Sequence, residues 1–215
     1  MVETSEGAVK ARRVWDRAAP GYDRQIALPE RFWFGGGREW LGARVEGRVL
    51  DVGVGTGRNL PHFPASVTVT GVDVSPGMLA VARQRAADLG RAVDLREADA
   101  ARLPFADGSF DTVVCALSLC AIADPRTAVT EMWRVLTPGG RLLLFDHVAS
   151  TWPPIFALQW LVERLSIPSA GEHFTRRQLP LVRATGFEIT ESVRRKAGTV
   201  ELIQAVKSES GTVPT

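Results

Sequence analysis

Short apolar runs alternate with amphipathic stretches between residues 48 and 146, and this alternation sets the expected fold. The apolar runs predict β-strands, and the longer stretches between them are typical of helices. An alternation of strand and helix indicates a parallel sheet with helices on both faces, and the near-continuous apolar runs 113–117 and 142–145 fit strands buried on both sides. The expected elements are strands 48–53, 67–73, 92–97, 110–117 and 140–146 and helices 57–63, 76–88 and 125–136.

Local signals support the helix boundaries. Ser75 and Asp124 are good N-cap residues, and each is followed by a proline, which the first turn of a helix tolerates. The sequence Thr-Pro-Gly-Gly at 137–140 is a strong stop for the helix before it, because proline and glycine disrupt helical backbone.

Two regions outside this alternation differ in character. Residues 8–45 contain a helix that Pro20 and Gly21 end, which is a lid candidate, and then an aromatic-rich segment expected mainly to pack. Residues 186–193 and 198–206 read as strands with a polar turn between them, so an antiparallel hairpin should complete a mixed sheet. The tail 208–215 is expected to be disordered.

The segment 149–183, between the last parallel strand and the hairpin, is rich in large apolar residues and is broken by prolines. An insertion at this place is expected to cover the substrate. Thr175 and Gln178 have the spacing of a capping box at the start of its last helix. A buried apolar face is the simpler explanation of residues 152–165, and peripheral contact with a membrane is the alternative.

Composition indicates one globular domain. The chain has 215 residues, of which 45% are hydrophobic, and this is enough to bury a single core. A formal net charge of +2 gives no reason to expect nucleic acid as a partner. Arg194, Arg195 and Lys196 form the only basic cluster, which we interpret as the charged end of the hairpin.

Cysteine usage and the chain start bear on the compartment. Cys115 and Cys120 are the only cysteines, so they predict reduced thiols and support neither zinc nor a disulfide framework. The first residues are polar and acidic, unlike a signal peptide, and the longest apolar runs, 112–123 and 152–162, are shorter than the ~20 residues of a membrane span. We expect a cytoplasmic protein.

Residues 51–57 form the most informative motif. An apolar strand ends in Asp51 and runs into Gly53, Gly55 and Gly57, where glycine lets backbone amides approach a ligand closely. The dinucleotide pattern Gly-x-Gly-x-x-Gly would need glycine at Arg58, so the NAD pattern fails by one place and an oxidoreductase is the weaker interpretation. A ribose without a pyrophosphate fits better.

Acids recur at the carboxyl ends of successive strands. Asp51, Asp73 and Asp99 each lie at the carboxyl end of a predicted strand, and ligands of open α/β sheets bind beyond those ends. Asp73 comes about 20 residues after the glycine turn, where a ribose-binding acid is expected. Three acids at one edge favour a binding site over surface decoration.

At this point the chain resembles class I S-adenosylmethionine-dependent methyltransferases of the ubiquinone/menaquinone-methylase-like group. The resemblance rests on residues 51–57, 71–78, Asp99 with 103–105, 109–111 and 131–140, and it covers roughly residues 12–206. Residues 115–122 and 145–150 are most similar to bacterial phospholipid N-methyltransferases and animal thiol S-methyltransferases. The resemblance implies a Rossmann-like α/β fold with a mainly parallel seven-stranded sheet and a C-terminal hairpin.

The resemblance also implies the cofactor, S-adenosylmethionine, its product S-adenosylhomocysteine, and a set of binding positions. The glycines would approach the methionine portion, Asp73 the ribose and Asp99 with Ala100 the adenine amine. Met78 would pack on adenine, the backbone at Ala116 would bind the ammonium, and Tyr22 would close over the cofactor. The expected set is Tyr22, Asp51, Gly53, Gly55, Thr56, Gly57, Asn59, Asp73, Val74, Met78, Asp99, Ala100 and Ala116.

Candidate bases are scarce. Many relatives carry His where this chain has Cys120 and Ala121, so His147 beside Asp146 is the best remaining base, with a loop histidine as the plain alternative. His173 and His62 are weaker candidates, and Cys120 either lines the pocket or is a packed thiol.

This poverty of bases favours an amine or thiol acceptor, in a small molecule or lipid headgroup. A C- or O-methyltransferase acting on a quinone or phenol is the alternative, and a non-catalytic cofactor-binding regulator is the alternative of another class. The catalytic candidates are His147, Asp146 and Cys120, and no metal is expected.

Overall fold

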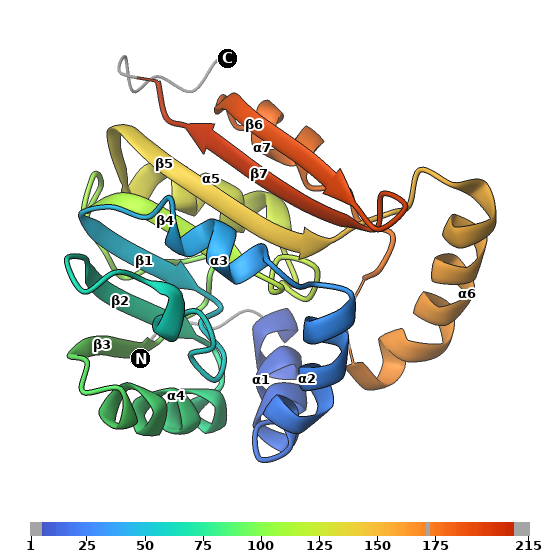
Figure 1. The fold of residues 1–215 in the computed structure, drawn as a ribbon, viewed down its shortest axis with the longest axis horizontal. Coiled ribbons are helices and arrows are strands. Elements are labelled where there is room, and N and C mark those ends of the chain that lie inside the picture. The colour runs from blue at the N-terminus through green and yellow to red at the C-terminus, as the bar shows by residue number, and fades with distance from the viewer. Residues whose placement is uncertain (1–5, 171–172, 209–215) are drawn as a thin grey trace.

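The computed structural model describes the backbone of residues 6–170 and 173–208, with side chains in α6 described as far as residue 164. Its centre is a seven-stranded sheet in the order β3-β2-β1-β4-β5-β7-β6 (Figure 1). The first five strands are parallel, and β7 runs antiparallel to both β5 and β6. The predicted mixed sheet with a C-terminal hairpin is confirmed. The strands are β1 Arg48–Val52, β2 Thr68–Asp73, β3 Val93–Glu97, β4 Phe110–Ala116, β5 Leu136–His147, β6 Glu188–Arg195 and β7 Val200–Val206.

Helices cover both faces of the sheet, as the alternation predicted. Buried residues of α5 and α7 pack with one face, and those of α3 and α4 pack with the other. The N-terminal helices α1 and α2 lie at one end of the sheet, beside α4 (Figure 1). The helices are α1 Glu6–Ala18, α2 Tyr22–Phe32, α3 Gly37–Gly42, α4 Pro76–Asp88, α5 Pro125–Val135, α6 Pro153–Ala170 and α7 Leu179–Ala184.

The predicted caps are present. Ser75 Oγ accepts a hydrogen bond from Met78 N at 3.0 Å, and Asp124 Oδ1 accepts one from Thr127 N at 3.0 Å. Each cap satisfies an amide that the first helical turn leaves without a partner. Helix α1 ends before Pro20 and Gly21 as expected, and Arg194, Arg195 and Lys196 lie at the end of the hairpin as predicted.

The predicted helix at 57–63 is wrong. The structure has turns at 55–59 and then only a 3-10 turn at Leu60–His62. Gly53, Gly55 and Gly57 all have positive φ, at 67°, 54° and 77°, and a left-handed residue such as Gly57 cannot form the first turn of a right-handed helix. The glycines therefore build an extended loop at the carboxyl end of β1 instead of a strand-to-helix turn.

The capping box at Thr175 is also wrong. Helix α7 begins at Leu179, and Gln178 makes no side-chain cap. The Thr175 hydroxyl and amide instead donate to the Glu163 carboxylate of α6, at 2.6 Å and 2.7 Å. The Thr175 side chain therefore makes a tertiary contact with α6 and does not cap α7.

Helix α6 projects from the body of the molecule (Figure 1) and is tied down at two points. Gln159 accepts from Ser150 N at 2.7 Å and donates to the Val148 carbonyl at 3.0 Å. Glu163 holds the segment that follows the helix through Thr175. The helix runs through Pro168, and its large apolar residues are mostly exposed, so the expectation of a buried face is wrong. The tail residues 209–215 lie outside the described residues.

Candidate functional site

A cavity opens beyond the carboxyl ends of β1, β2 and β4, where the sequence placed the ligand. Helices α1 and α2 contribute Trp15 and Tyr22 to its lining, so the N-terminal segment does cover this edge of the sheet. Most of the expected cofactor-binding residues line it. They are Tyr22, Gly53, Gly55, Thr56, Asn59, Asp73, Val74, Met78, Asp99, Ala100 and Ala116.

The glycine loop forms one wall of the cavity. A Cβ on Gly55 would meet nothing within 4 Å, so the backbone there faces open space that a ligand can approach. A Cβ on Gly53 would lie 2.6 Å from Ser118 Cβ, whose Oγ donates to the Gly53 carbonyl at 2.9 Å. Gly57 lies outside the lining and packs beside Leu60 and Ala82. The first two glycines shape the cavity, whereas the third allows close packing.

Asp73 closes β2 and organises the loop next to it. Its two carboxylate oxygens accept from Gly55 N and Ser75 N, each at 2.9 Å. Burial raises the pKa of Asp73 to about 6, and these backbone hydrogen bonds oppose that rise. The side chain is half-buried, so it keeps a surface towards the cavity.

Asp51 lies outside the cavity lining and has a supporting position. It is fully buried, and Asn59 Nδ2 donates to both of its oxygens, at 3.0 Å and 2.9 Å. Asn59 Oδ1 in turn accepts from Arg38 Nη1. Burial raises the pKa of Asp51 to about 7, while Asn59 and Arg38 lower it. This relay sets the position of the Arg38 guanidinium at the cavity wall.

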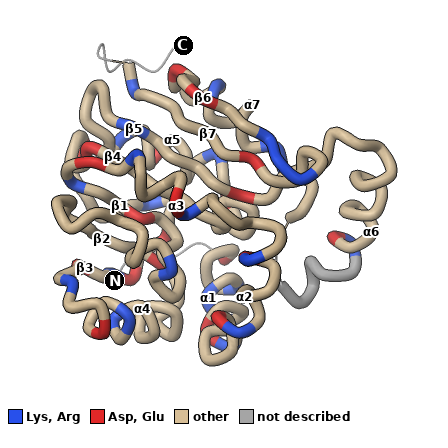
Figure 2. The backbone as a smooth tube through the Cα atoms, viewed as in Figure 1, with Lys and Arg blue, Asp and Glu red and all other residues tan. Residues whose placement is uncertain are grey.

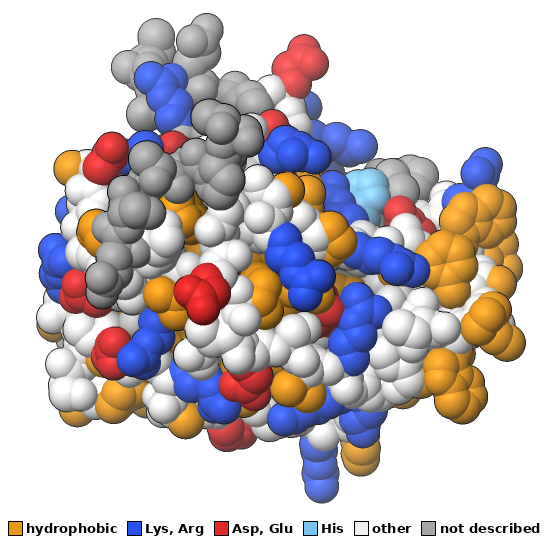
Figure 3. Space-filling view, turned by 90° about the horizontal axis from the view of Figure 1, so that it is seen from above, with side chains coloured by type: hydrophobic (Ala, Val, Ile, Leu, Met, Phe, Trp, Pro, Cys, Tyr) orange, Lys and Arg blue, Asp and Glu red, His pale blue; other side chains and the backbone are white. Residues whose placement is uncertain are grey.

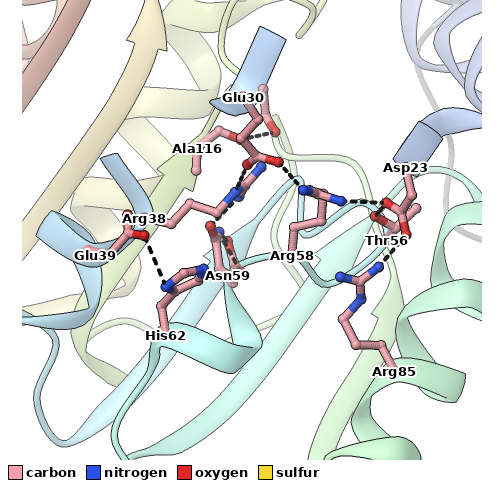
Figure 4. A network of polar contacts seen from close by, with 12 residues as sticks. Asp23, Glu30, Arg38, Glu39, Thr56, Arg58, Asn59, His62, Arg85 and Ala116 are labelled. Carbon is pink, nitrogen blue, oxygen red and sulfur yellow. Dashed lines mark hydrogen bonds and ion pairs between the residues drawn. The ribbon is translucent and has the colours of Figure 1, made fainter. Parts of the chain in front are cut away.

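Acids of α2 bind the arginines around the loop (Figure 4). Asp23 accepts from the Thr56 hydroxyl at 2.7 Å and also pairs with Arg85. Glu30 pairs with both Arg38 and Arg58. These charged contacts join the N-terminal helix to the glycine loop, and we call them the α2 latch, comprising Asp23, Glu30, Arg38, Arg58 and Arg85.

The opposite end of the cavity is apolar with one acid. Met78, Ala98 and Ala100 are buried, with Met78 2% exposed. Asp99 Oδ1 accepts from Ala101 N at 2.9 Å, so the carboxylate is held at the end of β3. A flat aromatic group with an amine at its edge would suit these neighbours.

The three catalytic candidates come together beside the cavity but outside its lining. The Cys120 sulfur, one carboxylate oxygen of Asp146 and one ring nitrogen of His147 lie within 4.8 Å of one another, and all three residues are buried. Asp146 Oδ2 accepts from Cys120 N at 3.0 Å, and Oδ1 accepts from His147 N at 2.8 Å. The ring of His147 stacks on Phe174 at 4.8 Å, and its Nδ1 has no hydrogen-bond partner.

This trio fits a metal poorly. Backbone amides already occupy both Asp146 oxygens, and three protein ligands are fewer than a closed zinc site uses. The Arg176 guanidinium is held close by, through the carbonyls of Leu119 and Ile122, and its charge would oppose a bound cation. Of the weaker candidates, only His62 lies elsewhere, 4.0 Å from Glu39. His173 lies beside the trio, because its backbone amide donates to the Cys120 carbonyl at 3.1 Å, while its ring pairs with Glu163.

Comparison with known proteins decides the family. A model of the methyltransferase domain matches residues 50–144. A ubiquinone/menaquinone biosynthesis C-methyltransferase, UbiE, of Geobacter sp. (strain M21) is 32% identical over 187 residues, covering 82% of this chain and 79% of that protein. The chain belongs to the class I S-adenosylmethionine-dependent methyltransferases.

Two further similarities add detail. A phosphatidylethanolamine N-methyltransferase of Cereibacter sphaeroides is 41% identical over 120 residues, which cover 55% of this chain and 59% of that enzyme. The solved structure of the [4+2]-cyclase SpnF matches this methyltransferase with a TM-score of 0.74 over 97% of this chain and 98% of its own, at 22% identity. The second similarity concerns the fold alone.

Sequence reasoning missed two charged contributors to the cavity of this methyltransferase, Arg38 and Arg58. Arg38 lies in α3, outside the strand ends where ligand residues were sought, and its partners are distant in sequence. The chain offers one usable signal, an arginine close before the first strand, but nothing local distinguishes it from its neighbours. No helix in the described ranges is long and apolar enough to cross a membrane.

Proposed function

We propose that this methyltransferase transfers the methyl group of S-adenosylmethionine to an amine or thiol, with the amine of a lipid headgroup as the favoured acceptor. One observation carries the choice of acceptor class: among the described residues that line the cavity there is no histidine, lysine or cysteine. A phenol or alcohol needs a base to become a good nucleophile, whereas a neutral amine has a free lone pair and a thiol needs only a modest shift in pKa.

The cofactor fits the residues present. Gly55 presents backbone to open space, the Asp73 carboxylate suits ribose hydroxyls, and Asp99 beside Ala100 suits the adenine amine. Arg38 is a candidate partner for the methionine carboxylate because its guanidinium reaches the cavity and is held by Asn59. When bound, the sulfonium supplies an activated methyl group.

The chain itself contributes alignment and exclusion of water. An ammonium acceptor first gives one proton to a base, and the lone pair of the neutral amine then forms the new bond to the methyl carbon. The carbon–sulfur bond breaks at the same time, the electron pair of that bond returns to sulfur, and the product is the methylated ammonium. In-line displacement needs the nucleophile about 3 Å from the methyl carbon, and such positioning supplies much of the rate acceleration. Trp15 and Tyr22 of the covering helices are the residues proposed to exclude water.

His147 is the proposed proton acceptor, with Asp146 and Cys120 as its neighbours. Its unpartnered Nδ1 is buried behind Phe34 and Phe174, so an acceptor that displaces either ring would reach it. We expect His147→Gln to lower kcat more than about tenfold while cofactor affinity stays unchanged. His62→Gln is the matched control. An unaltered kcat in the first variant would mean that His147 is a packed loop histidine.

A labelled-methyl assay tests the acceptor. The protein is incubated with methyl-labelled cofactor and, separately, phosphatidylethanolamine in mixed micelles, a simple amine, an alkyl thiol and a quinol. Label in the phosphatidylethanolamine arm supports the proposal. Label confined to the quinol would favour the C- or O-methyltransferase, which the UbiE relative supports. Cofactor binding without transfer to any acceptor would favour a non-catalytic role, since a fold does not prescribe a reaction.

A further inference from the structure

Helix α6, together with Trp152 immediately before it, exposes large apolar side chains in several directions. Trp152 is 62% exposed, Leu158 61%, Trp160 50% and Leu161 51%. Successive helical positions turn by about 100°, so 158 and 160 point to nearly opposite sides of the helix, and no single face carries these residues. In Figure 3 hydrophobic side chains gather at the right-hand end of the molecule, over this helix. An apolar helix of this kind needs surroundings that contact more than one side of it.

The end of α2 continues this surface. Phe32 is 63% exposed and Trp33 46% exposed. Trp33 Nε1 donates to Thr199 Oγ1 at 2.9 Å, and Ser150 Oγ donates to the Ala197 carbonyl at 2.7 Å, so the β6–β7 turn links the end of α2 to the start of α6. We call this the α2–α6 surface, which comprises Leu28, Phe32, Trp33, Trp152, Phe156, Leu158, Trp160, Leu161 and Val162.

The exposed charges of the described residues around the α2–α6 surface are all positive. In the described parts of α2, α6, residues 173–177 and the β6–β7 turn, the exposed charged side chains are Arg24, Arg31, Arg164, Arg177, Arg195 and Lys196. None of them pairs with a described acid. The acids of the same segments are engaged within the protein, Asp23 and Glu30 in the α2 latch and Glu163 with Thr175. Figure 2 shows basic residues at the hairpin end beside α6.

We propose that the α2–α6 surface docks on an anionic phospholipid bilayer. Tryptophans beside aliphatic residues suit the membrane interface, and lysine and arginine beside them suit acidic headgroups. A protein partner would cover one face of α6, whereas an interface can surround the helix. This inference extends the proposed lipid acceptor. Phe34, next to Trp33, and Phe174, after α6, cover His147, so a docked headgroup would arrive beside the candidate proton acceptor.

Vesicle flotation without cofactor tests the docking directly. We expect the protein to float with vesicles of phosphatidylcholine and phosphatidylglycerol and to bind pure phosphatidylcholine at least about tenfold more weakly, because each basic residue near an anionic surface adds attraction. The double variant L158D/W160D should lose binding to both kinds of vesicle, with and without phosphatidylglycerol. Leu89→Asp is the matched control, since Leu89 is 41% exposed at the end of α4, and it should bind as the wild type does.

A second pair of variants isolates the charge. The double variant R195E/K196E should lose at least about tenfold in affinity for anionic vesicles, and Arg126→Glu, an exposed position at the start of α5, should not. Wild-type protein that stays unbound, or equal binding by L158D/W160D, would overturn the proposal. So would a stable dimer in analytical ultracentrifugation that L158D/W160D dissociates, because a second copy would then cover the surface.

The two proposals can fail separately. Vesicle binding without methylation of phosphatidylethanolamine in any form would leave docking intact and refute the acceptor. Methylation of phosphatidylethanolamine in micelles without vesicle binding would support the acceptor and refute the docking.

Discussion

Asp73 is the side chain on which we expect cofactor affinity to depend most. Replacing it with Asn keeps its size but removes the charge that would accept from both ribose hydroxyls. The expected loss is about 2–3 kcal/mol of cofactor binding free energy, measured by calorimetry. Asp94→Asn, an exposed acid on β3 paired with Arg96, should bind normally. Unchanged binding by the Asp73 variant would contradict a ribose contact.

Asp51 should make stability depend on pH. Its folded pKa of about 7 lies above the ordinary value of about 4. The folded state therefore binds the proton more tightly than the unfolded chain, and the contribution to stability falls as pH rises from about 4 to about 7. Asp51→Asn should reduce the slope of the unfolding free energy against pH in that window, measured by urea titration, and Asp73, whose pKa is also raised, should account for the slope that remains. A slope as steep as that of the wild type would mean that another group titrates there.

Single residues were predictable where they follow a strand. Asp73 and Asp99 were found because periodicity places strand ends, and strand ends of a parallel sheet share an edge. Asn59 was expected among the cofactor-binding residues, in the first turn of a helix, but it lies in a loop and is buried between Asp51 and Arg38. That contact depends on how the loop folds back against α3, which no local pattern encodes.

At the scale of elements, the α2 latch should govern how firmly the N-terminal helices close the cavity. Glu30→Ala leaves Arg38 and Arg58 without their shared partner, so α2 should open more often. We expect amide hydrogen exchange in residues 6–32 to accelerate about tenfold or more, since protection follows the free energy of local opening. Glu39→Ala changes an exposed acid on α3 and serves as the control. Equal exchange in the two variants would show that packing alone holds the lid.

Helix boundaries were predicted correctly where residues next to each other in the sequence determine them. Helix α4 begins at its Ser75 cap and ends at Asp88 as predicted, because cap, proline and apolar spacing agree. The expected helix at 57–63 and the cap at Thr175 both failed. The helix is absent because the glycines adopt left-handed backbone conformations. The cap is absent because the Thr175 hydroxyl bonds the Glu163 carboxylate instead.

For the whole molecule, cofactor binding should stabilise the fold. A ligand that binds only the folded state at about 100 times its Kd adds about 2.7 kcal/mol. For a domain of this size that corresponds to a rise in Tm of roughly 5–10 °C. Differential scanning fluorimetry with S-adenosylmethionine measures it. NADH at the same concentration should give no shift, and a larger shift with NADH would favour the dinucleotide interpretation of the glycine loop.

The overall topology could be predicted from the sequence, whereas the exposure of α6 could not. Alternating strands and helices leave few topologies, and the observed sheet order is among them. The same apolar composition that suggested a buried cover belongs to an exposed helix, because composition alone does not say which surroundings satisfy it.

The two attachments of α6 have an evolutionary consequence. Gln159 and Glu163 lie one turn apart in α6 and join the helix to the two flanks of the insertion. Gln159 bonds the chain that leaves β5 at Val148, and Glu163 bonds the returning chain at Thr175. Lengthening a loop whose ends are already held adds little entropy cost, about 0.6 kcal/mol per doubling. This region is therefore open to replacement in evolution: a longer insertion that keeps the glutamine and the glutamate one helical turn apart would leave the glycine loop and the parallel strands unchanged.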